Sequence, residues 1–170
     1  METAALQKNI SETYKKFIKD LSSFSESEIN ISPFEGSWTA AQLTQHLILA
    51  SSGFTKMCSG KTEETDRNPA EKIDAIKDLF FNFEIKMQSP ESINPPNIKY
   101  DKNLLILALQ EIEQELLNVS KTFDLNLTCL AYEVSGFGKF TIYEWISFVL
   151  IHTQRHLKQL NTIFEAIKKH

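Results

Sequence analysis

Apolar residues recur at steps of four and three along two long segments of this chain. One series runs from Leu6 to Leu21 and another from Leu105 to Phe123. Because an α-helix makes one turn in 3.6 residues, these steps gather the apolar side chains on one side of a helix. Each segment therefore predicts a helix that buries one stripe. The stripes consist of Leu6, Ile10, Tyr14, Phe17 and Leu21, and of Leu105, Leu109, Ile112, Leu116, Val119 and Phe123.

The same four-residue signal marks two further helix starts. Thr39 is followed three residues later by Gln42, and Thr141 is followed at the same spacing by Glu144. In such a capping box the Thr hydroxyl accepts a hydrogen bond from the fourth residue's backbone N–H, and the fourth side chain accepts one from the Thr N–H. Apolar residues also occupy the flanking hydrophobic-staple positions, which are Trp38 and Leu43 in the first case and Phe140 and Trp145 in the second.

The chain is predicted to contain four long helices and one short accessory helix. The expected ranges are 2–21, 39–60, 101–123 and 141–167 for the long helices and 68–83 for the accessory helix, which would begin with Asn68 as cap and Pro69 in the first turn. Three prolines between 87 and 100 predict an extended crossover, and a strand at 128–134 would lack an evident partner. With only 5 Gly and 5 Pro, we predict an all-α four-helix bundle with long crossover connections, forming a single domain over 1–170.

The charge of the chain argues against two classes of partner. It has 18 Lys and Arg residues against 22 Asp and Glu, a net charge of −4, without a segregated basic patch. Such a chain repels phosphate backbones and anionic lipids, so we expect no nucleic-acid and no membrane partner. No apolar run approaches the roughly 20 residues of a membrane span, and the N-terminal residues lack a signal-peptide pattern. We therefore expect a cytoplasmic protein in which Cys58 and Cys129 are free thiols.

Two of the four histidines, His152 and His156, are four residues apart in the last predicted helix. This spacing places both imidazoles on one helix face, so both can bind one ion without a backbone movement. Neutral imidazole is a preferred ligand of Zn²⁺, Ni²⁺ and Fe²⁺. The pair alone is equally compatible with packed or solvated side chains. Thr153 stands where a zinc protease carries its Glu, so protease chemistry is not predicted.

His46 adds a third candidate ligand from another helix. It lies about two turns past its cap and in line with the inward apolar residues of its helix. Bundles build metal sites from inward side chains on facing helices. His46, His152 and His156 are therefore the predicted metal ligands, whereas His170, the last residue of the sequence, is expected to lie in solvent. Because ligating imidazoles must be neutral, binding should weaken below a pH of roughly 6.5.

Three parts of the chain resemble the DinB-like (damage-inducible) four-helix metal proteins. They are residues 37–47, SWTAAQLTQHL, residues 89–93, SPESI, and the final stretch with FTIYEW at 140–145 and HTQRHLKQL at 152–160. Together with the helix order, they cover nearly the whole chain. The resemblance implies a metal bound by one histidine of the second helix and two of the last, which match His46, His152 and His156.

The resemblance also implies a set of activities. Members of the family include divalent-metal thiol S-transferases, some of which use bacillithiol or mycothiol, and metal-dependent hydrolases. Three neutral histidines without a carboxylate leave a divalent ion its full charge and an open position, where a thiol or a water can be activated. We therefore predict a metal-dependent enzyme, a thiol S-transferase in preference to a hydrolase, with a low-molecular-weight thiol as a candidate substrate. Zn²⁺ and Ni²⁺ are the first candidates for the ion, followed by Mn²⁺ and Fe²⁺.

Other interpretations of the same residues stay open. The protein could be a non-catalytic module that binds a metal or small ligand, or a metal-free bundle in which the histidines only pack. A homodimer is the expected assembly, although no residue points to its interface.

Six residues near the candidate ligands are predicted to be structural: Tyr14 and Trp145 in the core, Arg155 and Gln159 at the surface, and Gln42 and Glu144 as capping partners. As alternatives, Tyr14 and Trp145 could face the metal, and Glu144 could act as an acid or base.

Overall fold

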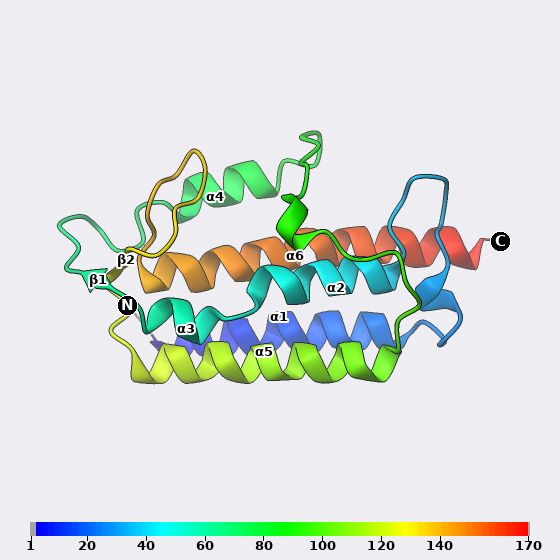
Figure 1. The fold of residues 1–170 in the computed structure, drawn as a ribbon, viewed down its shortest axis with the longest axis horizontal. Coiled ribbons are helices and arrows are strands. Elements are labelled where there is room, and N and C mark those ends of the chain that lie inside the picture. Colours follow the sequence, from blue (N-terminus) through cyan, green and yellow to red (C-terminus); the bar gives the residue numbers. More distant parts are fainter. Residues whose placement is uncertain (1–2, 170) are drawn as a thin grey trace.

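Four α-helices form the body of the computed structural model, which describes residues 3–169 (Figure 1). They are α1 (Thr3–Ser22), α2 (Ala40–Ser51), α5 (Lys102–Thr122) and α6 (Ile142–Lys168). Both α1 and α2 pack against α5 and α6, so the four helices surround one core. In Figure 1, α1 and α6 run in one direction and α2 and α5 in the other. The parallel pair α2 and α5 needs a long connection, which confirms the predicted bundle with a crossover.

The predicted apolar stripes form this core. Every residue of the first stripe is buried, and every residue of the second is buried except Phe123, which is half-buried. Tyr14 lies fully inside, with its hydroxyl hydrogen-bonded to Thr153 and Ser51, and burial raises its pKa to about 12. Tyr14 is therefore a core residue, as predicted. No helix in the described part of the chain is long and apolar enough to cross a membrane.

Both predicted capping boxes are present. Thr39 Oγ1 accepts a hydrogen bond from the Gln42 backbone N–H at 3.0 Å, and Gln42 Oε1 accepts one from the Thr39 N–H at 3.0 Å. Thr141 and Glu144 exchange the corresponding pair of bonds, also at 3.0 Å. These caps fix the first residues of α2 and α6. They thereby set how far along each helix its histidines lie.

Replacing either capping threonine by alanine should destabilise the protein by about 0.5–2 kcal/mol, because each change removes a helix-cap acceptor. We expect the larger effect for Thr141→Ala, since the buried Thr141 hydroxyl also donates to the Pro69 carbonyl oxygen at 2.7 Å. Urea unfolding followed by circular dichroism would measure both effects, with Thr39→Ser and Thr141→Ser as controls that keep the acceptor. Unchanged urea midpoints in both alanine variants would contradict the assignment.

The second helix ends earlier than predicted. Instead of continuing to residue 60, α2 stops at Ser51 and a separate helix, α3 (Phe54–Cys58), follows. Between them Gly53 has a φ of 74°, a left-handed conformation that glycine adopts readily and that commonly ends helices. The Thr55 backbone N–H then donates to Glu115 Oε1 of α5 at 2.6 Å, which holds the start of α3 against α5.

The accessory helix is present but shorter than predicted. It is α4 (Ile73–Phe80), and it lies beside the first half of α6, outside the four-helix core (Figure 1). Asn68 caps a turn rather than this helix, since its Oδ1 accepts a hydrogen bond from the Ala70 backbone N–H at 3.0 Å. Ile76 of α4 is fully buried in a small second apolar cluster with residues of the last helix and its approach.

Short elements complete the connections between the helices. Two strands, β1 (Thr62–Glu63) and β2 (Thr128–Cys129), pair antiparallel with Thr62 opposite Cys129. The strand considered at 128–134 is therefore shorter than expected and does have a partner. Two 3₁₀ turns, η1 (Glu28–Asn30) and η2 (Glu91–Ile93), lie in the other long connections. Cys58 and Cys129 are buried and free, as predicted.

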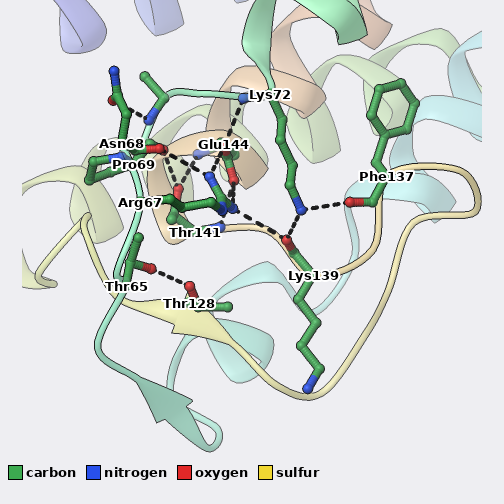
Figure 2. A network of polar contacts seen from close by, with 11 residues as sticks. Thr65, Arg67, Asn68, Pro69, Lys72, Thr128, Phe137, Lys139, Thr141 and Glu144 are labelled. Carbon is green, nitrogen blue, oxygen red and sulfur yellow. Dashed lines mark hydrogen bonds and ion pairs between the residues drawn. The ribbon is translucent and has the colours of Figure 1, made fainter.

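An ion pair between the half-buried Arg67 and the buried Glu144 ties two loops to the start of α6 (Figure 2). Arg67 donates from both Nη atoms to the two carboxylate oxygens of Glu144, each at 2.7 Å. Glu144 is 0% exposed and also accepts from the Lys72 backbone N–H at 3.0 Å, besides its capping contacts. The Lys72 ammonium in turn donates to the carbonyl oxygens of Phe137 and Lys139, both at 2.6 Å. The predicted capping residue Glu144 thus also fastens both loops to α6.

Candidate metal centre

His46 of α2 meets His152 and His156 of α6 between the two helices. The Nε2 atom of His152 lies 3.2 Å from Nε2 of His46 and 2.9 Å from Nε2 of His156. The three possible ligand atoms all lie within 4.8 Å of one another. His46 and His156 are 3% and 8% exposed, and His152 is more accessible. The structure therefore brings together the three histidines that the sequence singled out, while His170 lies outside the described residues.

The other ring nitrogen of two of these histidines has its own partner. His46 Nδ1 lies 3.0 Å from the carbonyl oxygen of Ile93, and His156 Nδ1 lies 3.0 Å from Oε1 of Gln159. Because a backbone carbonyl can only accept, His46 Nδ1 carries the proton and donates it, and the contact with Gln159 Oε1 favours the same tautomer in His156. Each Nε2 is then unprotonated and directs its lone pair toward the other imidazoles. This is the tautomer that a metal-ligating histidine needs, and such outer contacts commonly fix it.

The geometry of the three imidazoles fits a divalent ion. A neutral His152 has at most one Nε2 proton to offer to the two lone pairs that face it, so the group has more acceptors than donors. A cation between the three nitrogens would satisfy all of them. In a tetrahedral zinc site, Zn–N bonds of 2.0–2.1 Å separate the nitrogens by about 3.3 Å. The observed separations of 2.9 Å and 3.2 Å from His152 are close to this value.

Burial keeps the three imidazoles neutral. It lowers the pKa of His46, although the hydrogen bond to Ile93 opposes the shift. Burial also holds the pKa of His152 well below its ordinary value, and the nearby His156, His46 and Arg155 lower it further. The pKa of His156 falls to about 4, first through burial and then through the charge of His46. The histidines are therefore in their metal-binding form near pH 7.

Aromatic rings form the walls of the site. Phe148 stacks on His152 with an interplanar angle of 19° and ring centroids 6.0 Å apart. Phe80 of α4 approaches the same imidazole with its centroid 5.8 Å away, and the Trp38 centroid lies 5.1 Å from that of His46. These rings shield the histidines from water on the sides where they lie.

Residues 81–93, which we call the strap, connect α4 to the histidines. Besides the Ile93 carbonyl, the strap places Ser89 Oγ 3.4 Å from His46 Nδ1. Near its beginning, Arg155 of α6 donates to three backbone carbonyl oxygens, those of Phe80, Asn82 and Ile85. Arg155, which was predicted to be a structural residue at the surface, therefore binds the backbone of another segment.

Sequence reasoning missed most of the residues that support the three histidines. Gln159 is exposed, as predicted, but its side chain contacts His156. Phe148 could have been found, because it lies four residues before His152 and therefore on the same helix face. The Ile93 carbonyl could not, since a backbone group has no residue signature. Trp145 packs on Phe148 and on Phe140, in keeping with its predicted structural role.

Known proteins share both the sequence pattern and the fold. The model of the DinB superfamily matches residues 9–160. Among solved structures, the chain is similar to YfiT from Bacillus subtilis, described as a probable metal-dependent hydrolase with an unusual four-helix bundle topology. The TM-score is 0.61 at 12% identity, covering 96% of this chain and 86% of that one, so this likeness shows the fold alone. No curated protein matches the chain. Because the family match spans most of the sequence, the chain belongs to the DinB superfamily.

Proposed function

We propose that this protein is a divalent-metal-dependent enzyme whose ion is held by His46, His152 and His156. The observation that carries the proposal is the convergence of three Nε2 atoms, two of which belong to rings whose Nδ1 faces an acceptor oxygen. Membership of the DinB superfamily supports it, as does the description of YfiT as a probable metal-dependent hydrolase. Zn²⁺ and Ni²⁺ are the first candidates, because imidazole suits both ions, and Mn²⁺ and Fe²⁺ follow.

For the reaction we propose thiol S-transfer to a small electrophile, with a low-molecular-weight thiol as substrate. A divalent ion bound by three neutral ligands would supply a Lewis acid with an open position, at which a thiol or a water loses its proton near neutral pH. No Asp or Glu within residues 3–169 joins the histidine group. The chain thus offers no carboxylate there as a general base. A hydrolytic water is commonly positioned by such a base, whereas a thiol that is activated at the ion does not need one, so a thiol substrate is favoured.

The surrounding residues define how a substrate would reach the site. His152 retains the most exposed surface of the three histidines, although its imidazole is set deeply enough for burial to lower its pKa, so we propose that a substrate approaches on its side of the group. Phe80 and Phe148 flank this imidazole and present apolar surface to the incoming molecule. Hydrolysis is the second candidate function, and the description of YfiT is the observation that favours it.

Turnover by the metal-loaded protein tests this proposal. We expect protein loaded with Zn²⁺ or Ni²⁺ to accelerate the conjugation of cysteine, glutathione or bacillithiol to 1-chloro-2,4-dinitrobenzene, and we expect His152→Ala to abolish the acceleration. His170→Ala is the matched control and should behave like the wild type. Hydrolysis of p-nitrophenyl esters without thiol consumption would select the hydrolase. Metal binding without either turnover would instead indicate a non-catalytic binding module.

A further inference from the structure

The strap is attached to the rest of the protein at two places. Residues 81–88 are all exposed, so core packing does not hold them. Within the described residues, the Phe81 N–H continues α4 by donating to the Lys77 carbonyl oxygen, and the hydrogen bonds that join the strap to the four-helix body go to Arg155 at one end and to His46 at the other. The remaining hydrogen bonds of the strap are local, such as that from the Glu84 N–H to Asn82 Oδ1 at 3.1 Å. Arg155 and His46 therefore supply the hydrogen bonds that anchor the strap to the four-helix body.

Arg155 suits this task by the shape of its guanidinium group. Nη1 donates to the carbonyl oxygens of Phe80 and Asn82 at 2.6 Å and 3.2 Å, and Nη2 donates to that of Ile85 at 2.8 Å. The Phe80 carbonyl belongs to the last turn of α4, where carbonyls lack partners within the helix and carry partial negative charge, and those of Asn82 and Ile85 lie in the turn that follows, so one cation with several donors binds all three. The guanidinium carbon also lies 5.4 Å from the centre of the Phe83 ring. Arg155 thus fixes the course of the chain where α4 ends.

We infer that Arg155 is a positioning residue for the metal centre and acts on His46 through the strap. This inference rests on the proposed metal function. The strap supplies both acceptors that face Nδ1 of the buried His46, the Ile93 carbonyl and the Ser89 hydroxyl. If residues 80–85 are released, these acceptors can leave together. His46 then loses the contact that keeps its proton on Nδ1 and its Nε2 lone pair free for an ion. The contact between Gln159 and His156 differs from that between the strap and His46. Gln159 is exposed, so a water molecule can take the place of its side chain as the acceptor.

Zinc binding by Arg155→Met tests the inference, with Lys158→Met as the matched control. Lys158 lies on the same helix and places Nζ 3.6 Å from the centre of the Phe83 ring, so it contacts the same strap. We expect Arg155→Met to weaken Zn²⁺ affinity about 10-fold or more, the lower end of the effect of losing an outer-shell contact, and to speed zinc release to an excess of chelator. Lys158→Met should keep wild-type affinity, and Arg155→Lys should recover part of it.

Two readouts without bound metal separate positioning from general loss of structure. In Arg155→Met, backbone amides of residues 81–93 should exchange hydrogen faster while amides of α2 and α6 keep their protection. Long-range ¹H–¹⁵N spectra should show the His46 proton on Nδ1 in the wild type and in Lys158→Met, and a mixture of tautomers in Arg155→Met. If Arg155→Met fails to fold, Arg155→Gln, which also lacks the guanidinium, serves in its place for all measurements.

The outcomes distinguish this inference from the proposed function. Zinc affinity of Arg155→Met equal to that of the wild type, with an unchanged His46 tautomer, would overturn the inference and leave the metal centre intact. A wild-type protein that binds no zinc or other divalent ion would remove the proposed function, and the inference with it.

Discussion

We expect Glu144→Ala to lower the free energy of unfolding by about 3 kcal/mol, the lower end of the range seen when one partner of a buried ion pair is removed, because the remaining Arg67 is only half-buried. The change would leave the Arg67 guanidinium and the backbone N–H groups of Thr141 and Lys72 without their acceptor. Burial raises the pKa of Glu144, but the hydrogen bonds from Arg67, Thr141 and Lys72 outweigh it and hold the pKa below its ordinary value of 4.5. The ionised carboxylate is therefore stabilised by folding.

The pH dependence of this effect has a definite sign. Because the pKa of Glu144 is lower in the folded than in the unfolded chain, its stabilising contribution is fully present above pH 4.5 and is lost as the pH falls through the folded pKa. The difference in stability between the wild type and Glu144→Gln should therefore shrink as the pH drops below 4.5. Urea unfolding at a series of pH values measures it.

An exposed ion pair supplies the control for Glu144. Glu12 lies 3.7 Å from Lys8, one turn away on α1, and both side chains are exposed. Glu12→Ala should change stability by no more than about 0.5 kcal/mol, as is usual for surface pairs of this spacing. If Glu144→Ala costs no more than Glu12→Ala, the buried pair does not have the structural role that we assign to it.

Local sequence patterns were sufficient to find the four long helices and to predict that the three histidines meet, whereas metal binding by them stays a prediction. The stripes of α1 and α5 and the two capping boxes each lie within one segment, so neighbouring residues carry the whole signal. The end of α2 was missed because the apolar pattern continues through Phe54, although Gly53 breaks the helix there. His152 and His156 were predictable from their spacing. His46 was predictable because its cap fixes its depth in the helix.

Contacts between distant residues could not be predicted in this way. Arg67 and Glu144 are 77 residues apart, and His46 and the Ile93 carbonyl are 47 apart. No periodicity or spacing connects such residues before the chain is folded. The resemblance of residues 89–93 to a family segment drew attention to this region but did not indicate what the region does. In the structure, this segment supplies the acceptors for His46 Nδ1.

We expect His46→Ala, His152→Ala and His156→Ala each to remove high-affinity binding of a divalent ion. His152 should have the largest effect, because its Nε2 lies 3.2 Å from that of His46 and 2.9 Å from that of His156. Binding should also raise the melting temperature of the wild type, by an amount that grows with metal concentration. None of the three alanine variants should show this increase at the same metal concentrations.

Because the imidazoles are buried, protons should compete with the ion only at a lower pH than the sequence alone suggested. An unperturbed imidazole takes up a proton near pH 6.5, where the sequence alone placed the loss of binding. Burial lowers the pKa of all three histidines, that of His156 to about 4. Affinity should therefore persist as the pH falls below 6.5 and decline as it approaches 4. A decline centred at 6.5 would show that the histidines are more solvated than the structure indicates.

Metal content tests the account most directly. The measurement is elemental analysis of the wild type, His152→Ala and His170→Ala, each purified without added metal and then again after incubation with Zn²⁺, Ni²⁺, Mn²⁺ or Fe²⁺ and removal of the excess. We predict one divalent ion per chain in the wild type and in His170→Ala, and none in His152→Ala. If His170→Ala lost metal as readily as His152→Ala, or if the wild type retained none of the four ions, the three histidines would not be a metal centre.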